Sequence, residues 1–381
     1  MKDKLSIAVI TNVIPQYRED MYHRLVDNYG NDFHVFCQDK IPGMNLNTVH
    51  KNFNQNVTII KALSLQKEKL CWQFLPAFKI IKQYDVVFVY GNPRVLSNVI
   101  WSLILKTLGK KVVVWGQFHT ASSSSLMKKI RLWWWGIFDF IFLYTDKEAE
   151  QYRHLCPDVY YVTGMNNGVN QNEVNAAVNK CSQDILDAWA EENDLKDKVI
   201  LLSCARLDIK NQFEMVIESL PDIIKIYPDI LWCVIGDGDV KSALKEKAEK
   251  LGVAEYIKWL GPIYSQDKLA PWFLSARCLI HPGSIGLSLM HAMGYGLPVV
   301  THDNESHQMP EIAALIDGEN GLLFREGDKS SLIEKILLLI GDKELSKKLS
   351  SHAKQTVADN YNTKIMAEKF IGMVNKTQEK I

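Results

Sequence analysis

The stretch RCLIHPGSIGLSLMHAMGYGLPVVT, residues 277–301, decides the fold. Apolar runs at 277–281 and 297–301 have the length and composition of buried strands. Between them, a turn of small residues at 282–288 leads into a helical pattern at 289–295. A strand, a turn, a helix and a second strand in this order form the repeating unit of parallel α/β sheets. We therefore predict an α/β fold in which this unit belongs to a parallel sheet.

The same alternation of strands and helices extends over residues 199–360 and predicts a Rossmann-like, doubly wound domain. A last helix, expected at 362–376, lies in the segment 361–381, which we expect to pack back towards the N-terminal domain. The expected strands of the C-terminal domain are at 199–204, 230–235, 257–259, 277–281, 297–301 and 321–324, and its closing helices are at 329–341 and 343–358.

An earlier series of the same kind fills residues 1–165, and residues 166–198 form a linker region between the two domains. The run Val86-Val-Phe-Val89 is apolar throughout, which indicates a strand buried on both faces of its sheet. Two such domains facing across a cleft place their ligands at the carboxyl ends of the strands. The expected strands of the N-terminal domain are at 5–11, 33–37, 57–60, 85–90, 111–115, 140–144 and 159–162.

The composition restricts the class of protein. The chain has 381 residues, 47% of them hydrophobic, which suits two globular domains. Its formal net charge is zero, and this argues against a protein that binds nucleic acid through an excess of basic residues. The seven cysteines form no Cys-x-x-Cys pair and mostly lie in apolar runs, as expected of free thiols in the cytoplasm. No apolar stretch is long enough for a spanning helix, and the first residues read as a strand rather than a signal peptide.

Two cations follow the first expected strand of the C-terminal domain, at Arg206 and Lys210. On a loop after a strand they can hold a diphosphate, because Arg binds phosphate through a planar fork and Lys acts as a point charge. The alternative interpretation is a charged, solvated start of the next helix.

The turn between the two strands quoted above has a second phosphate-binding property. Gly283, Ser284 and Gly286 are small enough for backbone amides to approach an anion. The helix that follows points its positive end at the same place, so we expect the amides near Leu287 and Ser288 to bind phosphate. The alternative is a tight connection between strand and helix that binds nothing.

With these motifs the sequence resembles the retaining glycosyltransferases of family four, which have the GT-B fold of two Rossmann-like domains. The resemblance covers nearly the whole chain and is strongest from 199 to 324. Where that family has a Gly-Arg-Leu-x-x-x-Lys-Gly-like segment after a strand, this sequence has Ala205-Arg-Leu-Asp-Ile-Lys-Asn211. Val234-Ile-Gly-Asp-Gly-Asp239 and Trp259-Leu-Gly261 are similar to the family's next two connections.

The resemblance implies a role for each matching residue. Arg206 and Lys210 would bind the diphosphate of a nucleotide-sugar donor and stabilise the charge that builds on it as it leaves. Gly236 would lie beside the nucleotide, and the base would pack near Ile263 and Tyr264.

This sequence lacks the family's pair of glutamates, which are separated by seven residues. Their two places fall on Gly283 and His291. In the family the first acid contacts the transferred sugar and the second contacts the nucleotide ribose, so the resemblance does not specify the sugar. His291 can still hydrogen-bond a ribose hydroxyl through a ring nitrogen, and the alternative is a histidine that faces the core.

Residues 302–311 take the place of the family's glycine-rich loop, which ends in Pro-Glu. Glu311 matches that terminal acid. The histidines and carboxylates between 281 and 311 fit no common zinc spacing, and transfer in this family does not generally need a metal. We therefore expect no metal and no cofactor beyond the nucleoside-diphosphate-sugar donor.

The N-terminal domain supplies candidates for the acceptor side of the site. His119 follows an expected strand, as a histidine often does in this family, where it faces the reacting sugar. Tyr17 and Arg18 follow the first strand and are expected to meet an acceptor phosphate, or else to cap the next helix. Arg94 follows another strand in a similar loop.

Residues 127–138 combine basic residues with bulky aromatic ones, including Trp133-Trp-Trp135. Basic residues beside tryptophans suit the headgroup region of an anionic membrane. Three consecutive tryptophans cannot all point the same way on a helix, so we expect at least one to be exposed. The alternative is a helix whose tryptophans pack inside the domain.

The sequence thus predicts a cytoplasmic retaining glycosyltransferase, associated with the inner face of the membrane, that transfers a sugar from a nucleoside-diphosphate sugar to a saccharide or lipid-linked acceptor. Two alternatives stay open. A sugar-nucleotide epimerase can share this fold, and the missing glutamates allow a protein that binds a nucleotide sugar without turning it over.

Overall fold

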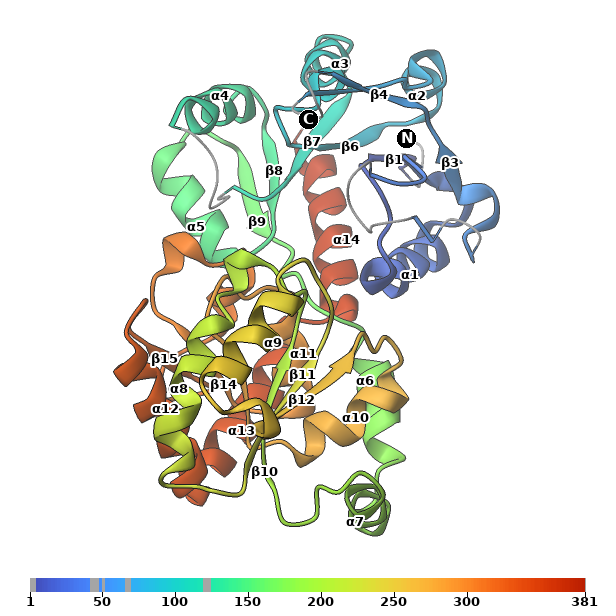
Figure 1. Ribbon diagram of the computed structural model, residues 1–381. Helices are drawn as coiled ribbons and strands as arrows, with labels where there is room; N and C mark the ends of the chain where they lie inside the picture. Colours follow the sequence, from blue (N-terminus) through green and yellow to red (C-terminus); the bar gives the residue numbers. More distant parts are fainter. Residues whose placement is uncertain (1–4, 42–47, 50–51, 66–69, 119–124, 381) are drawn as a thin grey trace. The chain divides into compact units, whose positions relative to one another are not determined.

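The structure is a computed structural model that describes residues 5–41, 48–49, 52–65, 70–118 and 125–380. The chain divides into two compact units (Figure 1). Unit 1 consists of residues 1–170 together with 363–381, and unit 2 consists of residues 171–362.

Unit 1 is built on a parallel sheet of seven strands in the order β3-β2-β1-β6-β7-β8-β9. The seven strands expected from the sequence are all present, with bounds that differ by at most a few residues. They are β1 (Ile7–Ile10), β2 (Phe33–Cys37), β3 (Val57–Ile59), β6 (Val86–Tyr90), β7 (Lys111–Gly116), β8 (Phe140–Leu143) and β9 (Tyr161–Gly164). An antiparallel pair that the sequence did not predict, β4 (Ala62–Leu65) and β5 (Leu70–Gln73), lies outside this sheet.

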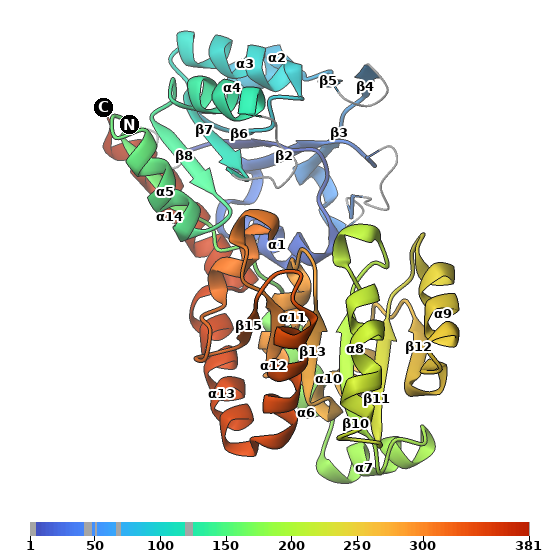
Figure 2. The same cartoon turned by 60° about the vertical axis from the view of Figure 1, so that its left-hand side comes forward.

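Both faces of the unit 1 sheet are buried under helices. Successive side chains along each strand point to opposite faces, so each strand contributes to two cores. In β6, Phe88 packs into a core with α1 (Glu19–Tyr29) and α14 (Thr363–Glu379). Its neighbours Val87 and Val89 pack into the opposite core. That second core is covered by α2 (Ala77–Gln83), α3 (Leu96–Thr107), α4 (Ser125–Trp135) and α5 (Asp146–Leu155) (Figure 2).

The C-terminal helix α14 belongs to unit 1 although the chain reaches it from unit 2. The ring of Phe370 in α14 stacks on Phe88, with ring centroids 4.0 Å apart. Thr363, at the start of α14, donates a backbone hydrogen bond to Val169 (3.2 Å). This contact joins the two segments that connect unit 1 to unit 2.

Unit 2 is built on a parallel sheet of six strands in the order β12-β11-β10-β13-β14-β15. All six strands were expected from the sequence, since each is a short, nearly continuous apolar run. They are β10 (Val199–Cys204), β11 (Ile230–Ile235), β12 (Ile257–Gly261), β13 (Cys278–His281), β14 (Val299–His302) and β15 (Leu322–Phe324).

Helices cover both faces of the unit 2 sheet. On one face the core includes side chains of α8 (Glu214–Ile224), α9 (Lys241–Lys250) and α12 (Lys329–Gly341). The other helices are α6 (Gln171–Asn179), α7 (Gln183–Glu192), α10 (Gln266–Ser275), α11 (Leu287–Tyr295) and α13 (Lys343–Asn360).

Residues 171–198 differ from the expected linker. They form α6 and α7 and belong to unit 2, where α6 packs against α10 and α11. The polar composition of this segment suggested a connection between domains, but an amphipathic helix needs only one apolar stripe to be part of a core. Val174 and Ala177 supply that stripe on α6.

Candidate active site

The loops at the carboxyl edge of the unit 2 sheet are in direct backbone contact with one another. Gly236, which follows β11, has a φ of +142°, and a Cβ there would collide with the carbonyl group of Ala205 after β10. A Cβ at Gly238 would collide with the Leu207 carbonyl in the same way. The Gly236 amide also donates to the carbonyl of Gly261 at the end of β12 (2.9 Å). Glycine is therefore required where these loops meet, because no side chain fits between them.

Arg206 and Lys210 lie on the loop after β10 with most of their side chains in solvent, 58% and 64% exposed. Arg206 lies 3.9 Å from an Asp239 carboxylate oxygen, and Lys210 lies 3.7 Å from an Asp208 oxygen. Exposed pairs at such distances contribute little free energy, so both cations can exchange these partners for a ligand.

The glycine turn after β13 lies directly against the Lys210 segment. A Cβ at Gly283 would lie 2.6 Å from the Asn211 Cα and closer still to the Lys210 carbonyl oxygen. The Ser284 amide donates to that same carbonyl oxygen (3.3 Å). The place where the resembled family has its first glutamate can therefore hold only glycine in this backbone arrangement.

The start of α11 completes this cluster. Gly286 is its N-cap residue, and the first amides of the helix, at Leu287 and Ser288, precede any intrahelical acceptor. The Ser288 hydroxyl donates to the carbonyl oxygen of Cys204 (2.6 Å) and so ties the helix start to the end of β10. The structure thus brings together Arg206, Lys210, the glycine turn and a helix N-terminus, which all favour an anion.

Gln308 holds the glycine turn in place, and sequence reasoning missed it. It is buried, and its side-chain oxygen accepts a hydrogen bond from the Ile285 amide (2.8 Å). Its side-chain nitrogen donates to the Thr301 hydroxyl and to the His302 carbonyl oxygen, both at 3.0 Å. All three bonds need a neutral amide, because a carboxylate cannot donate and an amine cannot accept.

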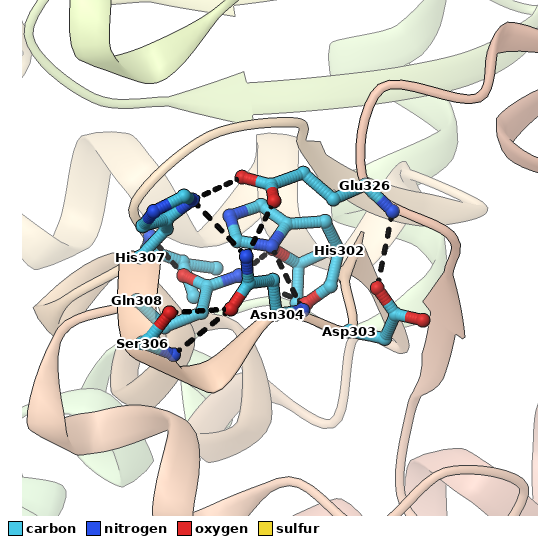
Figure 3. A network of polar contacts seen from close by, with 9 residues as sticks. His302, Asp303, Asn304, Ser306, His307, Gln308 and Glu326 are labelled. Carbon is cyan, nitrogen blue, oxygen red and sulfur yellow. Dashed lines mark hydrogen bonds and ion pairs between the residues drawn. The ribbon is translucent and has the colours of Figure 1, made fainter.

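The loop that carries Gln308 is fixed by a further polar network (Figure 3). The side-chain amide of Asn304 donates to one carboxylate oxygen of Glu326 (2.6 Å), and His307 Nδ1 lies 2.8 Å from the other carboxylate oxygen. Burial opposes the charge on Glu326, but the hydrogen bonds from His307 and Asn304 hold the pKa of this carboxyl below its ordinary value. The Asn304 backbone amide donates to His302 Nδ1 (3.2 Å), so that nitrogen carries no proton.

His291 and Glu311 lie near the start of α11. Burial lowers the pKa of His291 to about 4, so the ring is neutral at pH 7. Among the described residues, none hydrogen-bonds its buried Nδ1 atom. The two interpretations of His291, a contact with the ribose and a histidine that faces the core, both stay predictions. Glu311 is buried, and its Oε2 atom lies 3.9 Å from where a Cβ of Gly286 would be.

The remaining candidates of unit 2 lie after β12. Ile263 is half-buried and Tyr264 is exposed. An exposed aromatic ring on this edge of the sheet is free to stack on a base. That the nucleotide base packs there stays a prediction.

The acceptor-side candidates of unit 1 do not share one environment. Arg18 is buried, donates to the Asn167 side-chain oxygen through Nε (3.2 Å) and Nη2 (2.9 Å), and lies 4.7 Å from the ring centre of Tyr144. The guanidinium group of Arg18 therefore holds the segment around Asn167 in place and is not exposed as a free cation. Tyr17 is half-buried, Arg94 is exposed, and His119 lies outside the described residues.

The tryptophans of α4 divide between core and surface. Trp134 and Trp135 are fully buried, and their ring nitrogens donate to the Ser102 hydroxyl (3.0 Å) and the Gly91 carbonyl (3.1 Å). Trp133 is 65% exposed, which confirms that at least one of the three lies at the surface. Two of the three rings thus pack inside the domain, and contact of the segment with a membrane stays a prediction.

The described part of the chain shows neither a metal cluster nor a membrane span. Residues 5–41, 48–49, 52–65, 70–118 and 125–380 contain no group of three or more His, Cys, Asp or Glu side chains placed to hold a metal ion. The same residues contain no helix that is long and apolar enough to cross a membrane.

Solved structures identify the fold as GT-B. The Anabaena protein Alr3699/HepE in complex with UDP superimposes with a TM-score of 0.73 at 13% identity, covering 97% of this chain and 99% of that one. A glycosyltransferase from Rickettsia africae gives 0.72 at 14% identity over 100% of both chains. A putative UDP-N-acetylglucosamine 2-epimerase from Listeria monocytogenes gives 0.64 at 16% identity, covering 99% and 98%. The fold alone therefore does not separate a transferase from an epimerase.

The sequence similarity to known proteins lies mainly in unit 2. Residues 187–356 match the family model described as glycosyl transferases group 1. A similar protein is the lipopolysaccharide core biosynthesis glycosyltransferase LpsE of Rhizobium meliloti, 23% identical over 47% of this chain and 50% of that protein. Another is the putative glycosyltransferase EpsD of Bacillus subtilis, 27% identical over 42% and 41%. The chain thus spans about half the length of the curated relatives it matches.

Proposed function

We propose that the protein is a retaining glycosyltransferase that transfers a sugar from a nucleoside-diphosphate sugar to a saccharide or lipid-linked acceptor in the synthesis of surface polysaccharide or glycolipid. The observation that carries this proposal is the cluster at the carboxyl edge of unit 2. Two exposed cations, Arg206 and Lys210, stand beside a glycine turn and the start of α11.

The identity of the structural relatives supports a uridine nucleotide as donor. HepE has been solved with UDP and with UDP-glucose, and its chain is covered almost completely by this one. His291 is neutral at pH 7, and a neutral imidazole can donate one hydrogen bond and accept another, so we assign it to a hydroxyl of the ribose.

In the proposed reaction the acceptor hydroxyl attacks the anomeric carbon on the face from which the diphosphate departs. Negative charge builds on the diphosphate as its bond to the sugar breaks. Arg206, Lys210 and the amides of Leu287 and Ser288 stabilise this charge, and such preorganised groups often make the largest catalytic contribution. These groups suffice to meet the diphosphate without a divalent cation, so we propose that transfer is metal-independent and unaffected by a chelator.

Binding of UDP to purified protein tests the site directly. Each cation that hydrogen-bonds phosphate contributes about 1.5–3 kcal/mol, so Arg206→Ala and Lys210→Ala should each raise the Kd by about tenfold or more. Lys250→Ala is the control, because Lys250 is an exposed cation at the C-terminal end of α9, away from the loops that form the site. Equal UDP affinity in all variants, measured by calorimetry, would remove the diphosphate assignment.

Turnover separates the proposed function from its alternatives. Release of UDP from a UDP-sugar only when an acceptor is present indicates transfer, and the anomeric configuration of the product, read by NMR, indicates retention or inversion. A changed sugar without acceptor indicates an epimerase. Binding without any turnover across a panel of acceptors indicates a protein that only binds the nucleotide sugar.

We further propose that the protein works in the cytoplasm at the inner face of the membrane and contacts anionic lipid through α4. Exposed residues of this helix include Leu126 and Trp133, which share a face, together with Lys128 and Lys129. Apolar side chains inserted among lipid headgroups, with cations beside them, are typical of helices that lie on a membrane. All seven cysteines are free, as in a reducing compartment.

Co-sedimentation with vesicles tests the membrane contact. Trp133→Ala should lower binding to vesicles that contain phosphatidylglycerol and should leave the weak binding to neutral vesicles unchanged. Leu155→Ala is the matched control, since Leu155 is an exposed apolar side chain on α5. The contact is refuted if Trp133→Ala and the control sediment alike.

A further inference from the structure

A cavity of unit 2 lies at the edge of the sheet opposite the candidate active site. Its volume is about 310 Å³. Arg277 and Pro298, which line it, stand just before β13 and β14, whereas the loops described above follow these strands. Helix α11 begins at the glycine turn and ends at Tyr295, and both Tyr295 and the C-cap residue Gly296 line the cavity. Its nine residues span roughly 13 Å, so the cavity is separate from the candidate active site.

One wall of the cavity is a polar stripe on α13. Its residues are spaced so that they fall on one face of the helix, and they are Lys343, Ser346, Lys347, Ser350 and Lys354. The stripe begins in the first turn of this 18-residue helix, whose N-cap residue Asp342 accepts a hydrogen bond from the Leu345 amide (2.9 Å). Three ammonium groups and two hydroxyls therefore line the same space.

The opposite wall of the cavity adds a fourth cation and contacts the polar stripe of α13. Arg277 lines the cavity together with residues 295–298. Gly296 has a φ of +76°, and the side chain of Lys354 lies across it, so that even a Cβ at Gly296 would collide with the lysine. The Ser350 hydroxyl lies 2.9 Å from the same Cβ position. The side chain of Lys354, an exposed residue, therefore passes over Gly296 at the cavity.

No carboxylate lines this cavity. Its full lining is Phe273, Leu274, Ala276, Arg277, Tyr295, Gly296, Leu297, Pro298, Lys343, Ser346, Lys347, Ser350 and Lys354. In the described part of the chain, Lys347 pairs with Glu344 at 2.9 Å, an exposed pair of little strength, and no ion pair involves Arg277, Lys343 or Lys354. The formal net charge of the chain is zero, so the four cations of this lining are a local concentration of positive charge.

Ser346 adds a hydroxyl to the lining. The residue is 9% exposed and lines the cavity. A hydroxyl can donate a hydrogen bond to a group inside the cavity. An anion that accepts hydrogen bonds from a hydroxyl and several ammonium groups fits this lining.

We infer that this cavity binds a phosphate group, carried by a ligand about the size of a small phosphate ester. Phosphate has the charge for four cations and enough acceptor oxygens for the two serine hydroxyls as well. The phosphate can belong to a soluble ester or to a phospholipid headgroup. The inference does not depend on the proposed transferase activity, because none of the lining residues belongs to the candidate active site.

Binding of glycerol 3-phosphate tests the inference in a form of the full chain with Arg206→Ala and Lys210→Ala, which removes the other phosphate-binding cations. Addition of Lys343→Ala and Lys354→Ala should weaken binding by about tenfold or more, and Ser346→Ala should weaken it less. Lys348→Ala and Ser351→Ala are matched controls on α13, because both residues are exposed and neither lines the cavity. Circular dichroism and thermal unfolding establish that each variant is folded.

A parallel arm uses vesicles of phosphatidylglycerol in phosphatidylcholine. If the Lys343 and Lys354 substitutions reduce vesicle binding and glycerol 3-phosphate competes with it, the ligand is a headgroup. If they reduce binding of the soluble ester alone, the ligand is soluble. The inference is overturned if both probes bind the cavity variants and the controls equally, or if neither probe binds the protein with an intact cavity.

Discussion

Replacement of Gly283 by alanine tests the backbone contact on which the candidate active site depends. The added Cβ would lie 2.6 Å from the Asn211 Cα and 2.7 Å from the Asn211 carbonyl carbon. Both neighbours are backbone atoms, so the collision can be relieved only if the glycine turn and the Lys210 segment separate. Added volume in a closely packed site costs about 1–3 kcal/mol. For a domain of this size, each kcal/mol lowers the Tm by roughly 2–4 °C.

Thermal unfolding without ligand measures this effect, and Gly286→Ala is the control in the same turn. A Cβ at Gly286 would lie 3.5 Å from Met309 Cγ, which is ordinary van der Waals contact. We expect a lower Tm and weaker UDP binding for Gly283→Ala, and an unchanged Tm for Gly286→Ala. If Gly283→Ala unfolds at the wild-type temperature and binds UDP with wild-type affinity, the two loops do not depend on this contact.

Three further predictions concern other parts of the molecule. Gln308→Ala should impair UDP binding by removing all three hydrogen bonds, and Gln308→Glu should not restore it, because a buried carboxylate cannot donate to the His302 carbonyl oxygen; wild-type UDP affinity of Gln308→Glu in calorimetry would refute the role of the neutral amide. Burial lowers the pKa of His281 from 6.5 to about 4, so the unfolded chain binds its proton first and stability falls as the pH drops through this window. Urea titrations should therefore show a smaller loss between pH 6.5 and 4 for His281→Asn, and an equal loss would contradict the assignment. Trp135→Ala should lower the Tm of unit 1 by removing a buried ring, at a cost of about 3–5 kcal/mol, whereas Trp133→Ala should leave the Tm within about a degree.

The parallel sheets were predictable because their strands are encoded locally. A run such as Val199 to Cys204 is apolar along nearly its whole length, and a short run of this kind between helices is typical of a strand buried in a parallel sheet. The phosphate-binding character of the loops was also predictable, since small residues before a helix and cations after a strand are visible in the sequence. Why Gly283 stands in place of an acid follows only from the structure, which shows the backbone of Asn211 against it.

Other features depend on contacts that no short window of sequence contains. Gln308 acts through the Ile285 amide, which lies 23 residues earlier in the chain. Arg18 follows a strand just as Arg206 does, yet it is buried because Asn167 and aromatic rings surround it. The β4 and β5 pair was missed because its sequence has neither a long apolar run nor a turn that specifies a hairpin.

The return of the chain to unit 1 at α14 has a consequence for how the protein is made. A ribosome completes residues 171–362 before it reaches the helix whose Phe370 covers Phe88, so unit 2 is available for folding while the first sheet still lacks one of its covering helices. Until α14 emerges, the face of β6 that carries Phe88 lacks this cover and is accessible to water and to other nascent chains. The order of folding can thus be the reverse of the order of synthesis, because the unit that is synthesised first can complete its fold only after the second unit has been made.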